Sequence, residues 1–166
     1  MATNLPADLQ QVHAITLGDN VNTDLLHPPR FFGLSREAVL PGFLAGLPAE
    51  YAARFQPGDI LVGGKNFGCG SSREAYVRAF RYAGVGGVIA ASFSRIFYRN
   101  LINAGIPLAQ HPTLAAELAP WETIAFDART WMLYRLSTHE RIPLIPPEPH
   151  LQYILTAGGL LNYLGL

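Results

Sequence analysis

Residues 63–74 carry the side chains of this sequence that are best suited to chemistry, and they read GGKNFGCGSSRE. Glycines at positions 63, 64, 68 and 70 let the backbone take positive φ angles and approach a ligand closely. We expect Ser71 or Ser72 to cap the following helix, where free N–H groups attract an anion. Arg73 adds a charge and a fork that can hold a carboxylate. The stretch predicts a carboxylate or phosphate site, although a tight turn without a ligand would use the same glycines.

The same stretch does not match the two common nucleotide-binding motifs. A P-loop needs Gly-Lys followed by Ser or Thr, whereas Lys65 precedes the serines by several positions. The dinucleotide motif G-x-G-x-x-G needs a third glycine where Arg73 stands. We therefore expect the anion not to be a nucleotide.

Composition limits the classes of protein that the chain can belong to. With 166 residues it suits one α/β domain over residues 1–166. A formal net charge of zero lacks the basic footprint of a nucleic-acid-binding protein. No apolar run approaches the ~18 residues of a membrane span, and the first residues lack the pattern of a signal peptide. We expect a cytoplasmic protein, and its 49% hydrophobic content suggests a partner chain.

The metal-binding residues are few. Cys69 is the only cysteine, so the sequence predicts no internal disulfide and no cysteine-based metal site. The five histidines lack the spacing of a zinc protease. Any iron–sulfur or structural zinc centre would have to lie on another chain.

Alternating strand and helix patterns surround the glycine-rich stretch. Residues 59–62 and 88–91 read as buried strands, and helices are expected from residue 75 and over residues 95–104. This order predicts βαβ units and a parallel sheet. Because ligands bind beyond the carboxyl ends of such strands, residues 66–73 and 92–95 should face one pocket.

The segments on either side are more irregular. Residues 12–17 read as a strand that leads into a polar loop carrying Asp24, which could equally be a turn or cap residue. Pro28 and Pro29 should hold the next segment extended and present Arg30 from a loop. After residue 107 we expect a hairpin around residues 127–130, an edge strand at 141–145 and a closing helix over 150–163, broken at Gly158 and Gly159.

Three polar segments together resemble one known family. They are GDNVNTD at 18–24, NFGCGSSRE at 66–74 and SFSRIFYRN at 92–100. Their order and spacing are similar to those of the small subunit, or swivelling domain, of the aconitase superfamily. Length and composition are similar to the free-standing small subunits of 3-isopropylmalate isomerase (dehydratase) and homoaconitase. The resemblance covers residues 12–110. It implies an α/β swivelling domain of three layers in the order β/β/α, with a sheet that contains parallel strands.

The resemblance also implies an activity and a partner. Such enzymes isomerise 3-isopropylmalate and 2-isopropylmalate, or a related di- or tricarboxylic acid, by dehydration and rehydration. The family's large subunit holds a four-iron four-sulfur cluster that acts as a Lewis acid. The resemblance therefore implies no metal and no cofactor on this chain. It also implies an iron–sulfur large subunit as partner, in a heterodimer or heterotetramer.

Carried onto this sequence, the resemblance gives roles to individual residues. Ser71 resembles the general base that removes the proton α to a carboxylate, and Asp24 matches the acidic residue of the Thr-Asp motif. Ser72 and Arg73 resemble the carboxylate-binding pair, and Arg30 falls near a second arginine-bearing segment.

Selectivity is expected from the segment after the two prolines. Phe31, Phe32 and Gly33 present no cation for a distal carboxylate, which favours an alkyl-substituted malate. His27 stands where an aliphatic residue is usual in the family. The alternatives are a homoaconitase or methylmalate/maleate hydratase small subunit, or an anion-binding module without catalysis.

Overall fold

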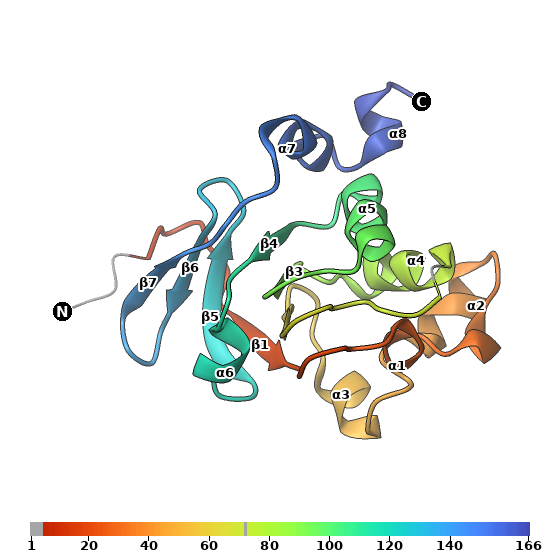
Figure 1. Ribbon diagram of the computed structural model, residues 1–166, viewed down its shortest axis with the longest axis horizontal. Helices are drawn as coiled ribbons and strands as arrows, with labels where there is room; N and C mark the ends of the chain where they lie inside the picture. Colours follow the sequence, from red (N-terminus) through yellow and green to blue (C-terminus); the bar gives the residue numbers. More distant parts are fainter. Residues whose placement is uncertain (1–4, 72) are drawn as a thin grey trace.

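The computed structural model describes residues 5–71 and 73–166. In this part of the chain, one mixed sheet has the strand order β4-β3-β2-β1-β5-β6-β7 (Figure 1). Four neighbouring strands are parallel: β1 (Val12–Thr16), β2 (Ile60–Gly63), β3 (Gly87–Ala90) and β4 (Leu108–Gln110). Three more continue from β1 in antiparallel order: β5 (Glu122–Asp127), β6 (Met132–Arg135) and β7 (Glu140–Pro143). The parallel strands confirm the predicted βαβ units.

The parallel strands form the middle of three layers. Successive side chains of a strand point to opposite faces. On one face, Ile15, Leu61 and Val88 belong to the core that includes buried residues of α4 (Glu74–Ala83) and α5 (Arg95–Ala104). On the other face, a second core joins the parallel strands to β5 and β6; its members include Ala14, Val62, Ile89, Ile124 and Leu133. The resulting β/β/α order, with antiparallel strands on the left of Figure 1 and most helices on the right, is the expected one.

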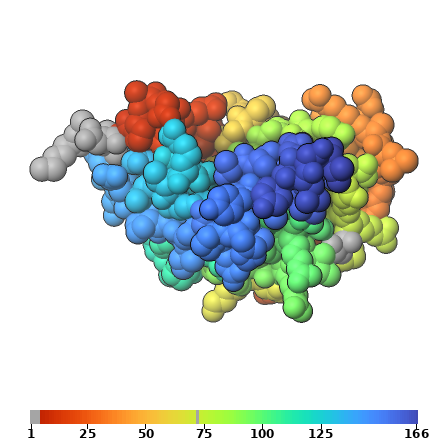
Figure 2. Space-filling view, turned by 90° about the horizontal axis from the view of Figure 1, so that it is seen from above, coloured from red at the N-terminus to blue at the C-terminus, as the bar shows by residue number. Residues whose placement is uncertain are grey.

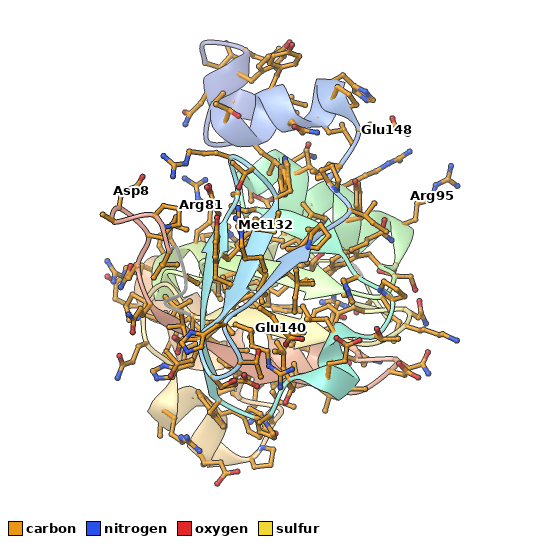
Figure 3. The ribbon with its side chains drawn as sticks, turned by 90° about the vertical axis from the view of Figure 1, so that its left-hand side faces the viewer. Asp8, Arg81, Arg95, Met132, Glu140 and Glu148 are labelled. Atoms are coloured by element: carbon orange, nitrogen blue, oxygen red, sulfur yellow. The ribbon has the colours of Figure 1, made fainter. Side chains whose placement is uncertain are left out.

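The sheet curls until its two edges meet. Gln110 of β4 and Ile145, just after β7, exchange two backbone hydrogen bonds, each of 2.9 Å. The pairing covers part of the β4 edge, which would otherwise present unpaired N–H and C=O groups. The outer strands β6 and β7 are seen face-on in Figure 3, where Met132 and Glu140 are labelled.

Glycines terminate the two helices that cross between parallel strands. Gly84 follows α4 with φ of 80°, and Gly105 follows α5 with φ of 72°. This left-handed conformation favours glycine and allows the last turns to be closed by backbone N–H groups. Both helix ends lie where the sequence predicts them.

The segment that follows β1 is more helical than predicted. Residues 23–26 form the short helix α1 (Thr23–Leu26), and Pro29–Phe31 form one 3-10 turn, η1. Asn22 caps α1, because its side-chain oxygen accepts a 2.8 Å hydrogen bond from the N–H of Asp24. Pro29 occupies the first position of η1, where a missing N–H costs nothing. The prediction of an extended loop over these residues was therefore wrong.

The remaining helices lie at the periphery. They are α2 (Arg36–Val39), the 3-10 turn η2 (Leu40–Gly42), α3 (Ala49–Arg54), α6 (Leu114–Glu117), α7 (Pro149–Thr156) and α8 (Leu160–Tyr163). The last two make up the predicted closing helix, divided at Gly158 and Gly159, and they pack on α5. The residues of α7 and α8 form the darkest blue part of the surface in Figure 2. None of the described helices has the length and apolar character needed to cross a membrane.

Candidate active site

The glycine-rich loop after β2 is joined to the loop after β1. The N–H of Thr23 donates to the carbonyl of Cys69 at 2.8 Å, and its hydroxyl donates to the carbonyl of Ser71 at 2.9 Å. The N–H of Gly68 donates to the carbonyl of Val21 at 2.8 Å. Segments that are nearly 50 positions apart in sequence are thus held side by side at the carboxyl ends of adjacent parallel strands.

The loop before α5 completes the same region. Ser92 accepts from two N–H groups of the glycine-rich loop: its side chain from Asn66 at 2.8 Å, and its carbonyl from Phe67 at 2.9 Å. The hydroxyl of Ser94 donates to the carbonyl of Gly68 at 2.6 Å. Ser94 is the N-cap residue of α5, but its side chain does not cap that helix. The loops at 66–73 and 92–95 therefore lie against each other, as their position beyond neighbouring strands predicts; that they face one pocket stays a prediction.

Two glycines of the loop are required by this close packing. A Cβ at Gly68, where φ is 76°, would lie 2.1 Å from the ring of Phe97. A Cβ at Gly70, where φ is 101°, would lie 2.6 Å from the side-chain oxygen of Asn22. Both positions combine a conformation that favours glycine with no room for a side chain.

Ser71 is exposed but does not cap α4. The helix begins at Glu74, and its N-cap residue is Arg73. The side chain of Arg73 makes no hydrogen bond to the N–H groups of the first turn. The bond from Thr23 holds the carbonyl of Ser71 outside the helix, and Arg73 is extended, with φ of −121° and ψ of 140°. The prediction of Ser71 as N-cap was therefore wrong; the alternative, Ser72, lies outside the described residues.

Asp24 follows the threonine that contacts Ser71. It is exposed in the first turn of α1, and Asn22 rather than Asp24 provides the cap of that helix. The Thr-Asp motif therefore presents a buried hydroxyl, which binds the loop, and beside it an exposed carboxylate.

Arg73 lies against the aromatic residues of the loop at 27–34, which we call the proline loop. Its guanidinium carbon is 4.8 Å from the ring centroid of Phe32, a favourable cation–π distance. Arg30, also exposed, lies over the ring of Phe31 at 4.7 Å. Both predicted carboxylate-binding arginines are thus exposed cations resting on a phenylalanine of one loop.

The proline loop is anchored from α4. The guanidinium of Arg78 donates to the carbonyl of Gly33 at 2.7 Å and to that of Leu34 at 3.2 Å. Phe31 and Phe32 are half-buried, whereas Leu34 is 88% exposed. A Cβ at Gly33 would lie 2.5 Å from the Cβ of Ala38, so position 33 has no room for a side chain.

Sequence reasoning missed two residues that build this site. Thr23 is 3% exposed and supplies the hydroxyl that fixes Ser71, and Asn22 caps α1 and packs on Gly70. Both lie within the segment GDNVNTD, and Thr23 directly precedes Asp24. The place of both residues in this segment, close to Asp24, was the available sequence signal. The contact between Thr23 and Ser71 could not be predicted from it, because 48 positions separate the two residues.

A four-iron cluster does not fit the donor set of this chain. Such clusters are held by several cysteine thiolates, and Cys69 is the only cysteine in the sequence. Among the described residues, no three His, Cys, Asp or Glu side chains come together in a way that could hold a metal ion.

The curled β/β/α domain, with its polar loops joined beyond the parallel strands, agrees with the aconitase-type family that the three polar segments resemble. Comparisons with known proteins give the same family. The family model described as the aconitase C-terminal domain matches residues 48–112. The 3-isopropylmalate dehydratase small subunit of Moorella thermoacetica is 41% identical over 153 residues, which is 89% of this chain and 90% of that protein. The isopropylmalate/citramalate isomerase small subunit of Methanocaldococcus jannaschii is 38% identical over 148 residues, 89% and 88% of the two chains.

A solved structure shows the same fold. The crystal structure of 3-isopropylmalate dehydratase from Methanocaldococcus jannaschii is similar with a TM-score of 0.87 and 34% identity, and the match covers 95% of this chain and 93% of that one. The chain therefore belongs to the 3-isopropylmalate dehydratase small-subunit family of the aconitase superfamily.

Proposed function

We propose that the chain is the small subunit of a hydro-lyase that interconverts 3-isopropylmalate and 2-isopropylmalate, or a related alkylmalate, by dehydration and rehydration. The observation that carries this proposal is the hydrogen bond between Thr23 and Ser71. It joins the Thr-Asp segment to the Ser-Ser-Arg segment, which supports a site built from the exposed residues Asp24, Ser71 and Arg73 on these two segments. The names of the relatives support the reaction and the subunit type.

Ser71 is the proposed general base, and it removes the proton from the carbon α to a substrate carboxylate. A serine hydroxyl at its ordinary pKa is too weak a base for this step, so its alkoxide has to be stabilised. The start of α4 lies three residues beyond the serine, and the N-cap residue Arg73 makes no side-chain hydrogen bond to the first N–H groups of the helix. These N–H groups and the charge of Arg73 lower the energy of a nearby anion. Asp24 is the proposed acidic partner on the adjoining segment.

Arg73 and Ser72 are the proposed ligands of one substrate carboxylate, and Arg30 is the proposed ligand of a second. An arginine on an aromatic ring keeps its edge N–H groups free for a two-point contact with a carboxylate. The two arginines both rest on the proline loop, so that loop determines their separation.

A large-subunit partner is part of the proposal. The relatives are named small subunits, which implies a larger chain with which each of them works. Because this chain's donor set does not fit an iron–sulfur cluster, we assign the four-iron four-sulfur cluster to that partner, in a cytoplasmic heterodimer or heterotetramer. Ser71, Arg73 and Asp24 are all exposed, as residues of a site completed by a second chain would be.

The apolar side chains of the proline loop favour an alkyl-substituted malate. A buried and unpaired substrate carboxylate costs several kcal/mol, so a tricarboxylic acid would need a further cation. A homoaconitase role is the second candidate, because the methanogen homoaconitase small subunit of Methanothermobacter thermautotrophicus is 37% identical over 147 residues, 88% of this chain and 85% of that one. Methylmalate, like isopropylmalate, carries an alkyl group in place of a third carboxylate, so the apolar side chains of the proline loop suit both substrates.

Reconstitution tests the proposal. The chain purified alone should be colourless and inactive, and the complex with a cluster-bearing large subunit should dehydrate alkylmalates. Ultraviolet–visible spectra and hydratase assays on the chain alone and on the complex measure both properties. Turnover by the isolated chain would refute the subunit assignment. A coloured complex that binds alkylmalates without converting them would instead identify a non-catalytic anion-binding module.

A further inference from the structure

His27, in the proline loop, is a buried histidine whose two nitrogens differ in their environment. Its side chain belongs to a residue that is 1% exposed, and Nε2 lies 2.8 Å from the carbonyl of Val39. A carbonyl can only accept a hydrogen bond, so Nε2 carries the proton and the ring is the Nε2–H tautomer. Nδ1 is buried and has no hydrogen-bond partner among the described residues. Desolvation by burial lowers the pKa of His27, and the positive charge of Arg78 acts in the same direction.

The surrounding structure is shaped around this imidazole. A Cβ at Gly42 would lie 2.4 Å from Nε2 of His27 and 2.5 Å from Cβ of Phe31, so only glycine leaves room for the ring. An aliphatic side chain at position 27 would fill similar space without burying an unpaired nitrogen, which is unfavourable in itself. The imidazole makes two contacts that an aliphatic side chain could not make, a hydrogen bond to Val39 and a ring stack with Phe32.

The imidazole supplies a flat face for Phe32. The ring centroids are 5.7 Å apart and the ring planes differ by 4°, which is an offset stack. Phe32 in turn contacts Arg73, whose guanidinium carbon is 4.8 Å from the phenyl centroid. A continuous contact thus runs from the Val39 carbonyl through two stacked rings to an exposed cation.

The geometry points to His27 as a positioning residue for Arg73. Its hydrogen bond to Val39 fixes the plane of the imidazole, the imidazole fixes the plane of Phe32, and Phe32 supports the guanidinium. Arg78 holds the other end of the loop through the carbonyls of Gly33 and Leu34. The inference rests on the proposed function only where it assigns Arg73 to a substrate carboxylate; the stack itself is independent of that role.

His27→Leu and Phe32→Leu, alone and combined, test the inference in the reconstituted two-chain enzyme. His27→Leu should raise the KM for an alkylmalate about two- to five-fold, the share of binding expected from an exposed cation–π contact, with kcat changed less. In the Phe32→Leu background, His27→Leu should have no further effect on KM, because the connecting ring is gone. Leu133→Ala is the control: it truncates a fully buried residue of the second core and should leave KM unchanged.

Nuclear magnetic resonance of the isolated full chain gives a readout that does not depend on activity. The δ protons of Arg73 should show an upfield ring-current shift that decreases in His27→Leu and Phe32→Leu but not in Leu133→Ala. The nitrogen shifts of His27 should report the Nε2–H tautomer. Unchanged Arg73 resonances in folded His27→Leu, additive effects on KM in the double variant, or an Nδ1–H tautomer would each overturn the inference. If His27→Leu does not fold, the His27 and Arg73 resonances of Phe32→Leu decide it.

The two hypotheses fail in distinguishable ways. A wild-type complex that converts no alkylmalate would contradict the proposed function, whereas the Arg73 resonances would still show whether the stack exists. Normal turnover with Arg73 resonances that do not respond to position 27 would leave the function intact and remove the positioning role.

Discussion

The hydroxyl of Thr23 donates a 2.9 Å hydrogen bond to the backbone carbonyl of Ser71, across a sequence separation of 48 residues. Thr23 is almost fully buried, while Ser71 is exposed. A rigid donor on α1 therefore sets the path of the loop that carries the proposed base. The threonine hydroxyl contacts the backbone carbonyl of Ser71 and not the serine side chain.

Thr23→Val should weaken catalysis more than stability. Valine has nearly the shape of threonine but cannot donate, so one hydrogen bond worth about 0.5–1.5 kcal/mol is lost. Misplacing a catalytic group by about 1 Å can cost ~10²-fold in rate, and we expect kcat to fall by about ten- to a hundredfold. Thermal unfolding and steady-state kinetics of the complex measure the two effects. Thr23→Ser, which keeps the hydroxyl, should retain most activity; equal rates in Thr23→Val and wild type would show that the bond does not position Ser71.

Ser71→Ala should remove turnover while leaving the fold intact. The carbonyl that accepts from Thr23 remains, and the lost hydroxyl is exposed, so the free energy of unfolding should change by less than about 0.5 kcal/mol. Loss of a general base typically costs 10²–10⁴-fold, and kcat should fall by at least about 10²-fold. Ser137→Ala is the control for activity alone, because Ser137 lies in the β6–β7 turn, where its hydroxyl donates to Glu122 and contributes to stability. Near wild-type rates in a folded Ser71→Ala complex would exclude the assignment of Ser71 as base.

Arg73→Lys should raise KM and lower kcat. Lysine keeps the charge but cannot form the planar two-point contact with a carboxylate or stack on Phe32 in the same way. A hydrogen bond to a charged group contributes about 1.5–3 kcal/mol, so kcat/KM should fall roughly ten- to a hundredfold. Arg54→Lys is a matched control, since Arg54 is also an exposed arginine over an aromatic ring, at 4.2 Å from Trp121. Similar losses in both variants would mean that Arg73 has no special role.

The βαβ part of the fold could be predicted from sequence because its signals are local. The apolar runs of β2 and β3 are buried along their whole length, and Gly84 and Gly105 mark both helix ends. The curling of the sheet could not be predicted, because the pairing of Gln110 with Ile145 depends on the path of all the strands between them.

The segments that form the candidate site could be predicted from sequence, but their local geometry could not. The loops at 66–73 and 92–95 meet as expected, since the carboxyl ends of parallel strands lie along one edge. The helix cap was misplaced because the bond from Thr23 keeps Ser71 outside α4. The segment around Asp24 was predicted as a polar loop, and the segment with Pro28 and Pro29 as extended. Instead, Asn22 caps α1, and the N–H of Leu44 holds the carbonyl of Leu26 at 2.7 Å. In both cases a tertiary contact outweighed a local preference.

Glu122 should make the fold sensitive to acid. Hydrogen bonds from Arg135, together with those from Ser137 and the N–H of Ala119, lower the pKa of Glu122 from 4.5 to about 2. A carboxyl whose pKa is lower in the folded state stabilises the fold above its unfolded pKa, and that stability is lost as the pH falls toward 2. The full shift corresponds to about 3 kcal/mol.

Glu122→Gln tests this dependence. The variant should be less stable at pH 7, and the stability difference from wild type should shrink between about pH 4.5 and pH 2. Urea unfolding at several pH values measures it. Glu140→Gln is the control, because Glu140, labelled in Figure 3, contacts Arg135 only at 3.5 Å and is exposed. A stability difference that stays constant down to pH 2 would mean that Glu122 has an ordinary pKa.

Leu34→Arg should change which acid the reconstituted enzyme prefers. Leu34 is 88% exposed at the end of the proline loop, and its carbonyl, not its side chain, is held by Arg78. Gly33 is unsuitable for this test, because any side chain there would meet Ala38. A pocket lined by apolar groups discriminates by only about 1–3 kcal/mol per methylene, whereas an unpaired carboxylate in a closed site costs several kcal/mol.

Wild-type enzyme should therefore convert isopropylmalate or methylmalate faster than homocitrate-type acids, and Leu34→Arg should narrow or reverse that difference. Values of kcat/KM for both substrate classes measure it, with Leu34→Gln as an uncharged control. A wild-type preference for the tricarboxylic acid would show that another cation, on this chain or its partner, pairs with the distal carboxylate, and would favour the homoaconitase assignment.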